Sequence, residues 1–265
     1  MALEIELKNV SWIWQGQTIL SEIDWKVQKG EHWAVMGLNG SGKTTLLNMI
    51  NGYIWPSIGT VQVMGNLFGK TDIREMRKSI GWVSSSLQER IRGVEQAVDI
   101  VVSGKFASIG LYERPNEHDY QKAYQLMEQL GCSGVADSSY QSCSQGERQK
   151  ILIARGLMGN PRLLILDEPT NGLDFLAREE LLESVSRLAE QEASPTIIYV
   201  THHAEEILPI FSHTLLLKDG KVFEEGQTES VLTSQNLSRF LNKDIKVEWY
   251  QGRPWMLLKE KLKRS

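Results

Sequence analysis

The sequence predicts an α/β protein whose core is a mostly parallel sheet, with an N-terminal antiparallel β subdomain and an inserted α-helical subdomain. Three observations support this prediction. Short apolar runs at 32–36, 163–166 and 197–201 have the length and composition of buried parallel strands, with helical patterns along the chain between such runs. Residues 4–10 alternate polar and apolar side chains, and 18–27 do so roughly, as half-buried strands do. From about 85 to 159 the pattern becomes helical.

The remaining elements follow in order. Further strands are expected at 60–64, 80–83, 214–217 and 222–224, and helices at 43–50, 147–158 and 175–190. One more helix is expected to end at Gly131 and to turn an apolar face to the core, formed by Tyr120, Ala123, Tyr124, Met127 and Leu130. We therefore predict one domain over 1–240, with its helical subdomain at about 86–160, and a C-terminal extension over 241–265.

The composition limits the classes of function. The chain has 265 residues, 41% of them hydrophobic, which allows a sizeable core. The net charge of -4 provides no global basic field, so no nucleic-acid partner is expected, although a local basic patch stays open. Cys132 and Cys143 form no CxxC pair, which favours a reducing compartment without disulfides. We expect neither a signal peptide nor a membrane span, so a membrane role would need a partner.

A glycine-rich loop indicates the first phosphate site. Residues 37–45, GLNGSGKTT, match G-x-x-x-x-G-K-[ST] in full, after a strand pattern and before a helix pattern. Glycines let backbone N–H groups converge on a phosphate, Lys43 supplies charge for the β- and γ-phosphates, and Thr44 can place its hydroxyl on Mg²⁺. The match predicts a P-loop NTPase core. The predicted nucleotide-binding residues are Gly37, Asn39, Gly40, Ser41, Gly42, Lys43, Thr44 and Thr45.

Two acids end the next long apolar strand. Asp167 and Glu168 follow the run 163–166, and the carboxyl end of a parallel strand lies beside the phosphate loop. Asp167 is expected to hold Mg²⁺, directly or through water, and Glu168 to orient and deprotonate the attacking water. An acidic surface loop is the alternative for this pair taken alone, but the complete P-loop favours the catalytic interpretation.

The order of these motifs resembles the nucleotide-binding domain of ABC ATPases. The P-loop, then CSQGE at 143–147, LLILDEP at 163–169, NGLD at 171–174 and VTHH at 200–203 occur in that family's order, and the resemblance covers about residues 3 to 230. It implies that Ser144 and Gly146 form the signature motif, which contacts the γ-phosphate of ATP bound to the opposite chain. It also implies a head-to-tail dimer, either a homodimer or a pair with a second ABC ATPase subunit.

The resemblance implies three further roles. Asp174 is similar to the acid at the dimer seam, and His202 to the switch histidine that reaches the γ-phosphate. Trp14 lies where the family has an aromatic that stacks on adenine, although a half-buried strand tryptophan is the alternative. His203 has no matching role.

Two departures from the family pattern matter. The usual signature is LSGGQ, and here Cys143, Gln145 and Glu147 replace three of its five residues. We expect Cys143 to be buried in place of the leucine, and Glu147 to favour the helix dipole or, if it points inward, to oppose the phosphate. The family's Q-loop glutamine falls on Ser85 by simple alignment, with Gln88 three residues later. Either Gln88 reaches in, or Ser85 or a water substitutes.

The resemblance implies Mg²⁺-dependent ATP hydrolysis, with ATP and Mg²⁺ as ligands and Lys43, Glu168 and His202 as catalytic residues. A transporter motor, cytoplasmic and peripheral at the inner face of the cell membrane, would pair with separate permease subunits. The alternative is a soluble ABC ATPase that acts on the ribosome or DNA. An apolar cluster of Phe106, Ile109, Leu111 and Tyr112 is a candidate dock for a permease, or ordinary packing.

The C-terminal extension has its own pattern. Trp249 and Trp255 are followed by a basic end over 259–264. This segment could bind lipid headgroups or a partner, but we expect the tryptophans to pack on the core and the charges to stay solvated.

Overall fold

The computed structural model describes residues 3–106, 110 and 114–259. Its strands are β1 (Leu3–Trp14), β2 (Gln17–Gln28), β3 (Trp33–Met36), β4 (Ile58–Val63), β5 (Asn66–Leu67), β6 (Ile80–Val83), β7 (Leu163–Asp167), β8 (Thr196–Thr201), β9 (His213–Lys218), β10 (Lys221–Gln227), β11 (Ile245–Tyr250) and β12 (Arg253–Leu258). Its helices are α1 (Lys43–Ile50), α2 (Ile73–Lys78), α3 (Ser85–Gln88), α4 (Ala97–Ser103), α5 (Glu117–Gln129), α6 (Gln145–Leu157), α7 (Phe175–Ala189), α8 (Thr228–Val231) and α9 (Ser234–Leu241), and the 3₁₀ turn η4 is Ala204–Glu206.

The central sheet confirms the predicted fold class. Within the described residues, six strands are ordered β10-β9-β3-β8-β7-β6, parallel except for β10. Alternate residues of each buried strand face opposite cores, so Leu163 and Ile165 contact one hydrophobic cluster while Leu164 and Leu166 contact the other. Register places Met36 beside Thr201 and Asp167 beside Val200. The carboxyl ends of β3, β8 and β7 therefore meet at one edge of the sheet.

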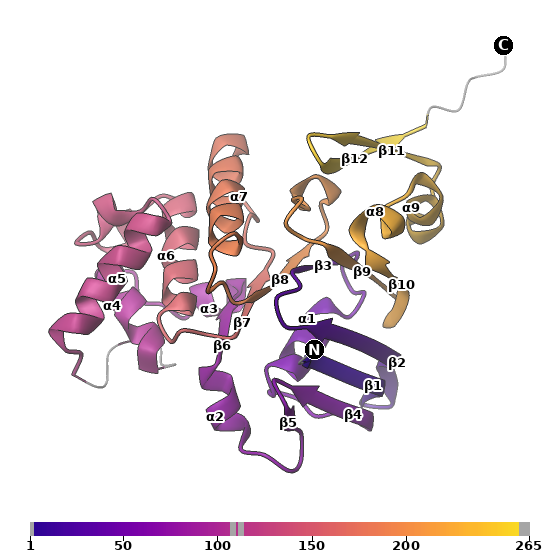
Figure 1. Cartoon of the computed structure of the whole chain (residues 1–265), viewed down its shortest axis with the longest axis horizontal. Helices are drawn as coiled ribbons and strands as arrows, with labels where there is room; N and C mark the ends of the chain where they lie inside the picture. The colour runs from indigo at the N-terminus through magenta and orange to yellow at the C-terminus, as the bar shows by residue number, and fades with distance from the viewer. Residues whose placement is uncertain (1–2, 107–109, 111–113, 260–265) are drawn as a thin grey trace.

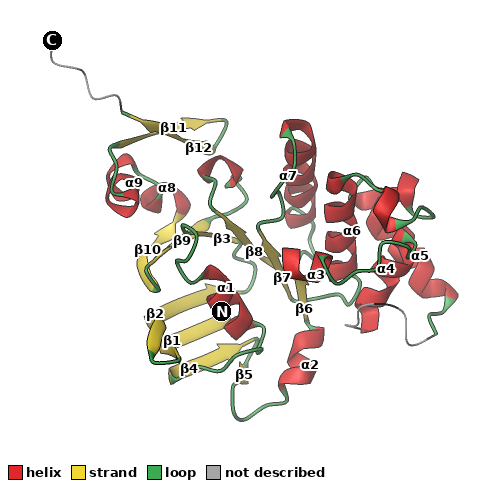
Figure 2. Ribbon diagram, turned by 180° about the vertical axis from the view of Figure 1, so that it is seen from behind, coloured by secondary structure: helices red, strands yellow, loops and turns green. Residues whose placement is uncertain are grey.

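A second, antiparallel sheet precedes the core. Its order is β2-β1-β4-β5, and Figures 1 and 2 show it beside α1, apart from the helices of the inserted region. Both β1 and β2 are longer than the alternation predicted, because the pairing continues through register shifts to Trp14 opposite Gln17. Bulges of this kind interrupt the period of two that the sequence pattern uses.

Helices α4, α5 and α6 lie together on the β6 side of the central sheet (Figure 1). The predicted stripe on α5 is partly right, because Ala123, Met127 and Leu130 are buried but Tyr124 is 40% exposed. In the predicted apolar cluster, Phe106 packs against the core, whereas Ile109, Leu111 and Tyr112 lie outside the described residues. The boundaries at 86–160 and 240/241 stay predictions.

The C-terminal region forms elements that the sequence did not predict. Strands β11 and β12 pair as a hairpin, and Arg253 bonds from it to the Glu179 carboxylate and, at 2.6 Å, to the backbone carbonyl of Glu205. The expectation for the tryptophans is wrong, because Trp249 and Trp255 are 40% and 37% exposed. Val247 and Met256 pack on the core instead. Trp255, paired with Glu248, lies on the opposite face of the hairpin, whereas Trp249 lies on the same face as Val247 but next to the turn, where it stays partly exposed. In the described part of the chain, no helix has the length and apolar character to cross a bilayer.

Candidate functional site

Three loops meet at the carboxyl edge of the central sheet. The P-loop follows β3, the two acids end β7, and His202 follows β8. A cavity of about 370 Å³ opens there. The described residues that line it are Ile19, Asn39, Gly40, Gly42, Lys43, Thr44, Thr45, Asp167, Glu168 and Asn171. The structure thus brings together most of the predicted P-loop residues and both predicted acids. Ile19 and Asn171 also line the cavity, although no sequence pattern indicated them as site residues.

The P-loop has the backbone that phosphate binding requires. Gly40 and Gly42 have φ of 80° and 103°, in the left-handed region where a side chain is strained. A Cβ on Gly37 would lie 2.7 Å from the Leu217 carbonyl oxygen, so only glycine fits there. Helix α1 begins at Lys43 with no side chain capping its first N–H groups. These donors and the positive end of the helix dipole face the cavity and favour an anion.

Lys43 and Glu168 are held close to each other. The buried Lys43 ammonium donates to the Gly37 carbonyl at 2.7 Å and lies 3.4 Å from Glu168 Oε1. Glu168 has φ of 50°, and its backbone N–H donates to the Val200 carbonyl at 2.9 Å. This left-handed backbone, uncommon for a residue with a side chain, turns the carboxylate out of the line of β7.

His202 completes this group from the neighbouring strand. Its Nδ1 lies 3.3 Å from Glu168 Oε1, within ion-pairing distance, but the geometry makes no hydrogen bond and leaves the buried Nδ1 without a partner. The Lys43 ammonium and the His202 imidazole therefore lie near the same carboxylate oxygen of Glu168.

Asp167 and Thr44 offer oxygen ligands of the kind Mg²⁺ takes. Burial, and then the Glu168 charge, raise the pKa of Asp167 to about 6, against a lowering by Lys43. Thr44 is exposed to the cavity, and the buried hydroxyl of Ser41 has no hydrogen-bond partner. Oxygen donors beside a phosphate loop fit a magnesium nucleotide.

Trp14 stands at the end of the β1–β2 hairpin. It is 58% exposed and stacks on Trp12, with ring centroids 5.6 Å apart and planes 13° from parallel. The same hairpin carries Ile19, which lines the cavity. Its exposure leaves Trp14 a candidate for stacking on adenine.

The signature residues lie apart from this cavity within one chain. Ser144 and Gly146, both described, are not in its lining. Ser144 caps α6, and Glu147 Oε2 accepts from both the backbone N–H and the hydroxyl of Ser144, at 2.7 and 2.8 Å. Cys143 is buried as expected, and burial raises the pKa of its thiol.

The segment that begins with Asp174 lies at the surface. Asp174 caps α7 through Ala177 N–H at 2.9 Å, and the two residues that follow it, Phe175 and Leu176, are 63% and 70% exposed. Exposed apolar side chains of this size are typical of an interaction surface.

Gln88, one candidate for the Q-loop role, is not in the lining of the P-loop cavity. The side-chain oxygen Oε1 of Gln88 accepts from Gln149 Nε2 at 3.2 Å, so the Gln88 side chain points toward α6. Ser85 begins α3. No sequence pattern indicated Glu206, a buried carboxylate in the turn after His202, because a single acid gives no signal of burial.

Comparison with known proteins agrees with these features. The profile of the family described as "ABC transporter" matches residues 20–171, and that of "AAA domain, putative AbiEii toxin, Type IV TA system" matches 137–208. The chain is 50% identical over 253 residues to the uncharacterized ABC transporter ATP-binding protein YlmA of Bacillus subtilis, with 95% of this chain and 96% of that protein covered.

Solved structures give the same result. An inward-facing conformation of a putative metal-chelate type ABC transporter matches with a TM-score of 0.78 and 29% identity, over 98% of both chains. The post-hydrolysis dimer of the ATP-binding cassette MJ0796, bound to ADP and Pi, matches with a TM-score of 0.73 and 26% identity, over 84% of this chain and 98% of that one. With the family profile covering more than half of its residues, the chain belongs to the ABC transporter ATP-binding proteins, a family of ATPases.

Proposed function

We propose that this ATPase hydrolyses Mg²⁺-bound ATP in a head-to-tail dimer and thereby energises a membrane transporter through separate permease subunits. The observation that carries the chemical part is that Lys43 Nζ and His202 Nδ1 lie 3.4 and 3.3 Å from the same oxygen of Glu168, beside a complete P-loop.

Each side chain has a defined task in this proposal. Lys43, Ser41 and the N–H groups of the P-loop bind the phosphates, and Trp14 stacks on adenine. Thr44 and Asp167 hold Mg²⁺, which offsets charge on the β- and γ-phosphate oxygens. Glu168 orients the attacking water and accepts its proton, and His202 contacts the γ-phosphate. Because phosphoryl transfer needs positioning and charge neutralisation above all, rigid placement of these groups supplies most of the rate.

The separation of the signature residues from the P-loop cavity within one chain supports the proposed dimer. Ser144 and Gly146 stand at the start of α6, outside the P-loop cavity of their own chain. A second copy, placed head to tail, would bring them to the γ-phosphate on Lys43 of the first. The exposed Phe175 and Leu176 beside Asp174 would be covered at that seam. A mixed pair with another ABC ATPase subunit would use the same contacts.

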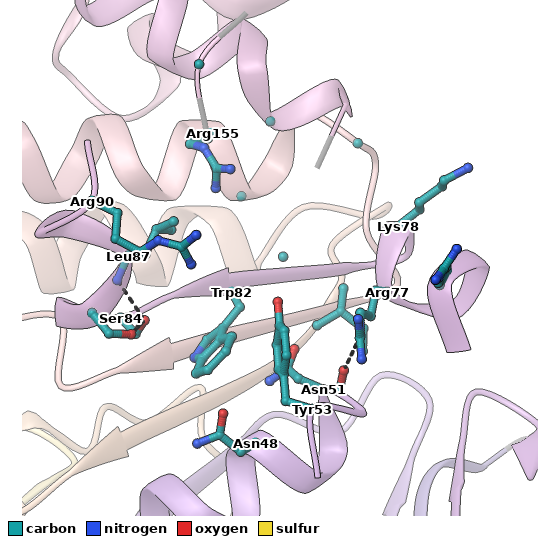
Figure 3. A pocket seen from close by; sticks show the side chains of 18 of the residues that line it. Asn48, Asn51, Tyr53, Arg77, Lys78, Trp82, Ser84, Leu87, Arg90 and Arg155 are labelled. Carbon is teal, nitrogen blue, oxygen red and sulfur yellow. Dashed lines mark hydrogen bonds between the residues drawn. The ribbon is translucent and has the colours of Figure 1, made fainter. Parts of the chain in front are cut away.

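A basic cleft supports the transporter role. A cavity of about 1050 Å³ opens between β6, the end of α1 and the inserted helices, next to the Q-loop segment (Figure 3). Its described lining includes the cations Arg74, Arg77, Lys78, Arg90, Arg92 and Arg155 against one acid, Glu95. Arg77 donates to the Asn51 carbonyl at 3.0 Å and lies over the Tyr53 ring. We infer that a permease segment with acidic residues docks here, which would place the protein at the inner face of the cell membrane.

Two measurements test this function. Glu168→Gln should bind ATP, form a stable dimer and hydrolyse ATP very slowly, and near-normal turnover would remove Glu168 from the role of base. For the transporter role, the tagged chain should be recovered with membranes rather than ribosomes. The double variant Arg90→Glu, Arg92→Glu should lose the membrane fraction, while the control Lys221→Glu, on the distant β10, should keep it. Recovery with ribosomes would instead favour the soluble alternative.

A further inference from the structure

A buried carboxylate joins the two loops that carry Glu168 and His202. Glu206, in the turn η4, is 2% exposed. Its Oε1 accepts a hydrogen bond from the Thr170 hydroxyl at 2.8 Å, and its Oε2 accepts one from the Thr201 hydroxyl at 2.6 Å. Thr170 follows β7 and Thr201 ends β8, so one oxygen holds each loop.

Three hydroxyl groups donate to this carboxylate. Tyr199 adds a third bond to Oε2 at 3.2 Å, and its phenol stays a donor because burial, and then the Glu206 charge, raise the pKa of Tyr199 well above its ordinary value. Placing a charge in a core costs free energy that an apolar side chain would not incur. Hydrogen bonds to an ionised oxygen are stronger and more directional than neutral ones, so the arrangement fixes a geometry that simple packing does not.

The geometry that it fixes is that of the proposed hydrolytic pair. Thr170 lies two residues after Glu168, and Thr201 immediately precedes His202. The Thr201 hydroxyl also accepts from the His203 backbone N–H at 3.0 Å, which orders the start of the histidine loop. A cavity of about 110 Å³ is lined by Glu168 and His202 together with Glu206 and both threonines. The bridge therefore forms a wall of the space between the two side chains.

We propose that Glu206 is a positioning residue for ATP hydrolysis, which sets the distance between Glu168 and His202 by bridging Thr170 and Thr201. The inference rests on the proposed roles of Glu168 and His202. Because Glu206 touches no substrate in this account, its loss should lower kcat and leave the KM for ATP and the ATP affinity nearly unchanged.

The test compares single variants with their combination in the full-length chain. Thr170→Val keeps the shape of the side chain but removes the donor to Oε1, and Glu206→Gln keeps the shape but removes the charge. Each should lower kcat about 10-fold or more, since small displacements of reacting groups have effects of this size. The double variant should be no slower than the slower single, because both changes break one bridge.

Controls separate positioning from stability and from the proposed function. Thr214→Val removes another buried threonine hydroxyl, which in β9 forms a 3.0 Å hydrogen bond with the Thr228 hydroxyl. This variant should lower the melting temperature about as much as Thr170→Val does, but should leave kcat unchanged. The proposal is wrong if Thr170→Val keeps kcat within twofold of the parent, raises KM alone, or adds fully to Glu206→Gln. Glu168→Gln is measured alongside: if it stays active, the assignment of the base fails, whatever Thr170→Val does. If Glu206→Gln does not fold, Thr170→Val decides.

Discussion

The signature serine, Ser144, is held by Glu147, whose Oε2 lies 2.7 Å from the Ser144 backbone nitrogen and 2.8 Å from its hydroxyl oxygen. With Ser144 Oγ accepting from the Glu147 N–H at 3.3 Å, the pair forms a capping box. The hydroxyl proton therefore points to a carboxylate of its own chain and must leave it to reach a phosphate.

Glu147→Gln is expected to lower the KM for ATP. The amide is a weaker acceptor than the carboxylate and removes a negative charge near the γ-phosphate, a difference of about 1 kcal/mol or roughly fivefold. The melting temperature should fall slightly, because the charge favours the helix N-terminus. Glu229→Gln, an equivalent change in the first turn of α8, is the control and should not alter KM. A KM that is unchanged or higher would contradict this interpretation.

Two inactive chains should restore activity when mixed. Lys43→Ala and Ser144→Ala homodimers each lack one half of both sites. In a mixed head-to-tail dimer one site has both defects and the other has none, so a 1:1 mixture should regain about a quarter of the parent ATPase rate. The measurement is turnover after co-refolding or long incubation. Absence of any regain, with mixed dimers demonstrated by differential tags, would exclude a shared site.

The stability of the protein should depend on pH through Asp167. Its pKa rises from 3.8 in the unfolded chain to about 6 in the fold, so the folded state binds the proton more tightly. This group's favourable contribution is fully present below 3.8 and is lost as pH rises through about 6. Asp167→Asn does not titrate. The melting temperature of the variant minus that of the parent should therefore rise between about pH 4 and 7, measured without nucleotide. A constant difference would show that the carboxyl is not perturbed.

Trp14 should contribute to binding and not to chemistry. Base stacking on an aromatic is worth about 1–3 kcal/mol, so Trp14→Ala should raise the KM for ATP roughly 10-fold with little change in kcat. Trp14→Phe should retain most of the affinity. Trp255→Ala, a change at another exposed tryptophan, is the matched control. Equal KM values for Trp14→Ala and the parent would show that adenine binds elsewhere.

The sequence predicted that the P-loop and the two acids lie together, because its signals there are local. The strand of 163–166 and the P-loop each occupy a few consecutive residues whose chemistry allows little else, and parallel pairing then brings Lys43 and Glu168 to the same edge. The roles expected for Ser144 and His202 come from the family resemblance and stay predictions.

What the sequence missed depends on distant contacts. Glu206 is an ordinary acid until Thr170 and Thr201 reach it from two other loops. The exposure of Trp255 was misjudged, because which face of a two-stranded ribbon is buried depends on its register with the core. Trp249 lies on the packed face, but it is next to the turn, where the core covers it only in part. The direction of the Gln88 side chain depends on Gln149, 61 residues away.

Arg253 connects the C-terminal hairpin to the loop after His202. Its guanidinium bonds the Glu205 carbonyl, three residues after His202, and the Glu179 carboxylate of α7. The β11–β12 hairpin thus supports the loop that follows His202. A chain shortened before residue 242 would not be a minimal version of this enzyme, because the His202 loop, for which we propose a contact with the γ-phosphate, would lose its bond to Arg253.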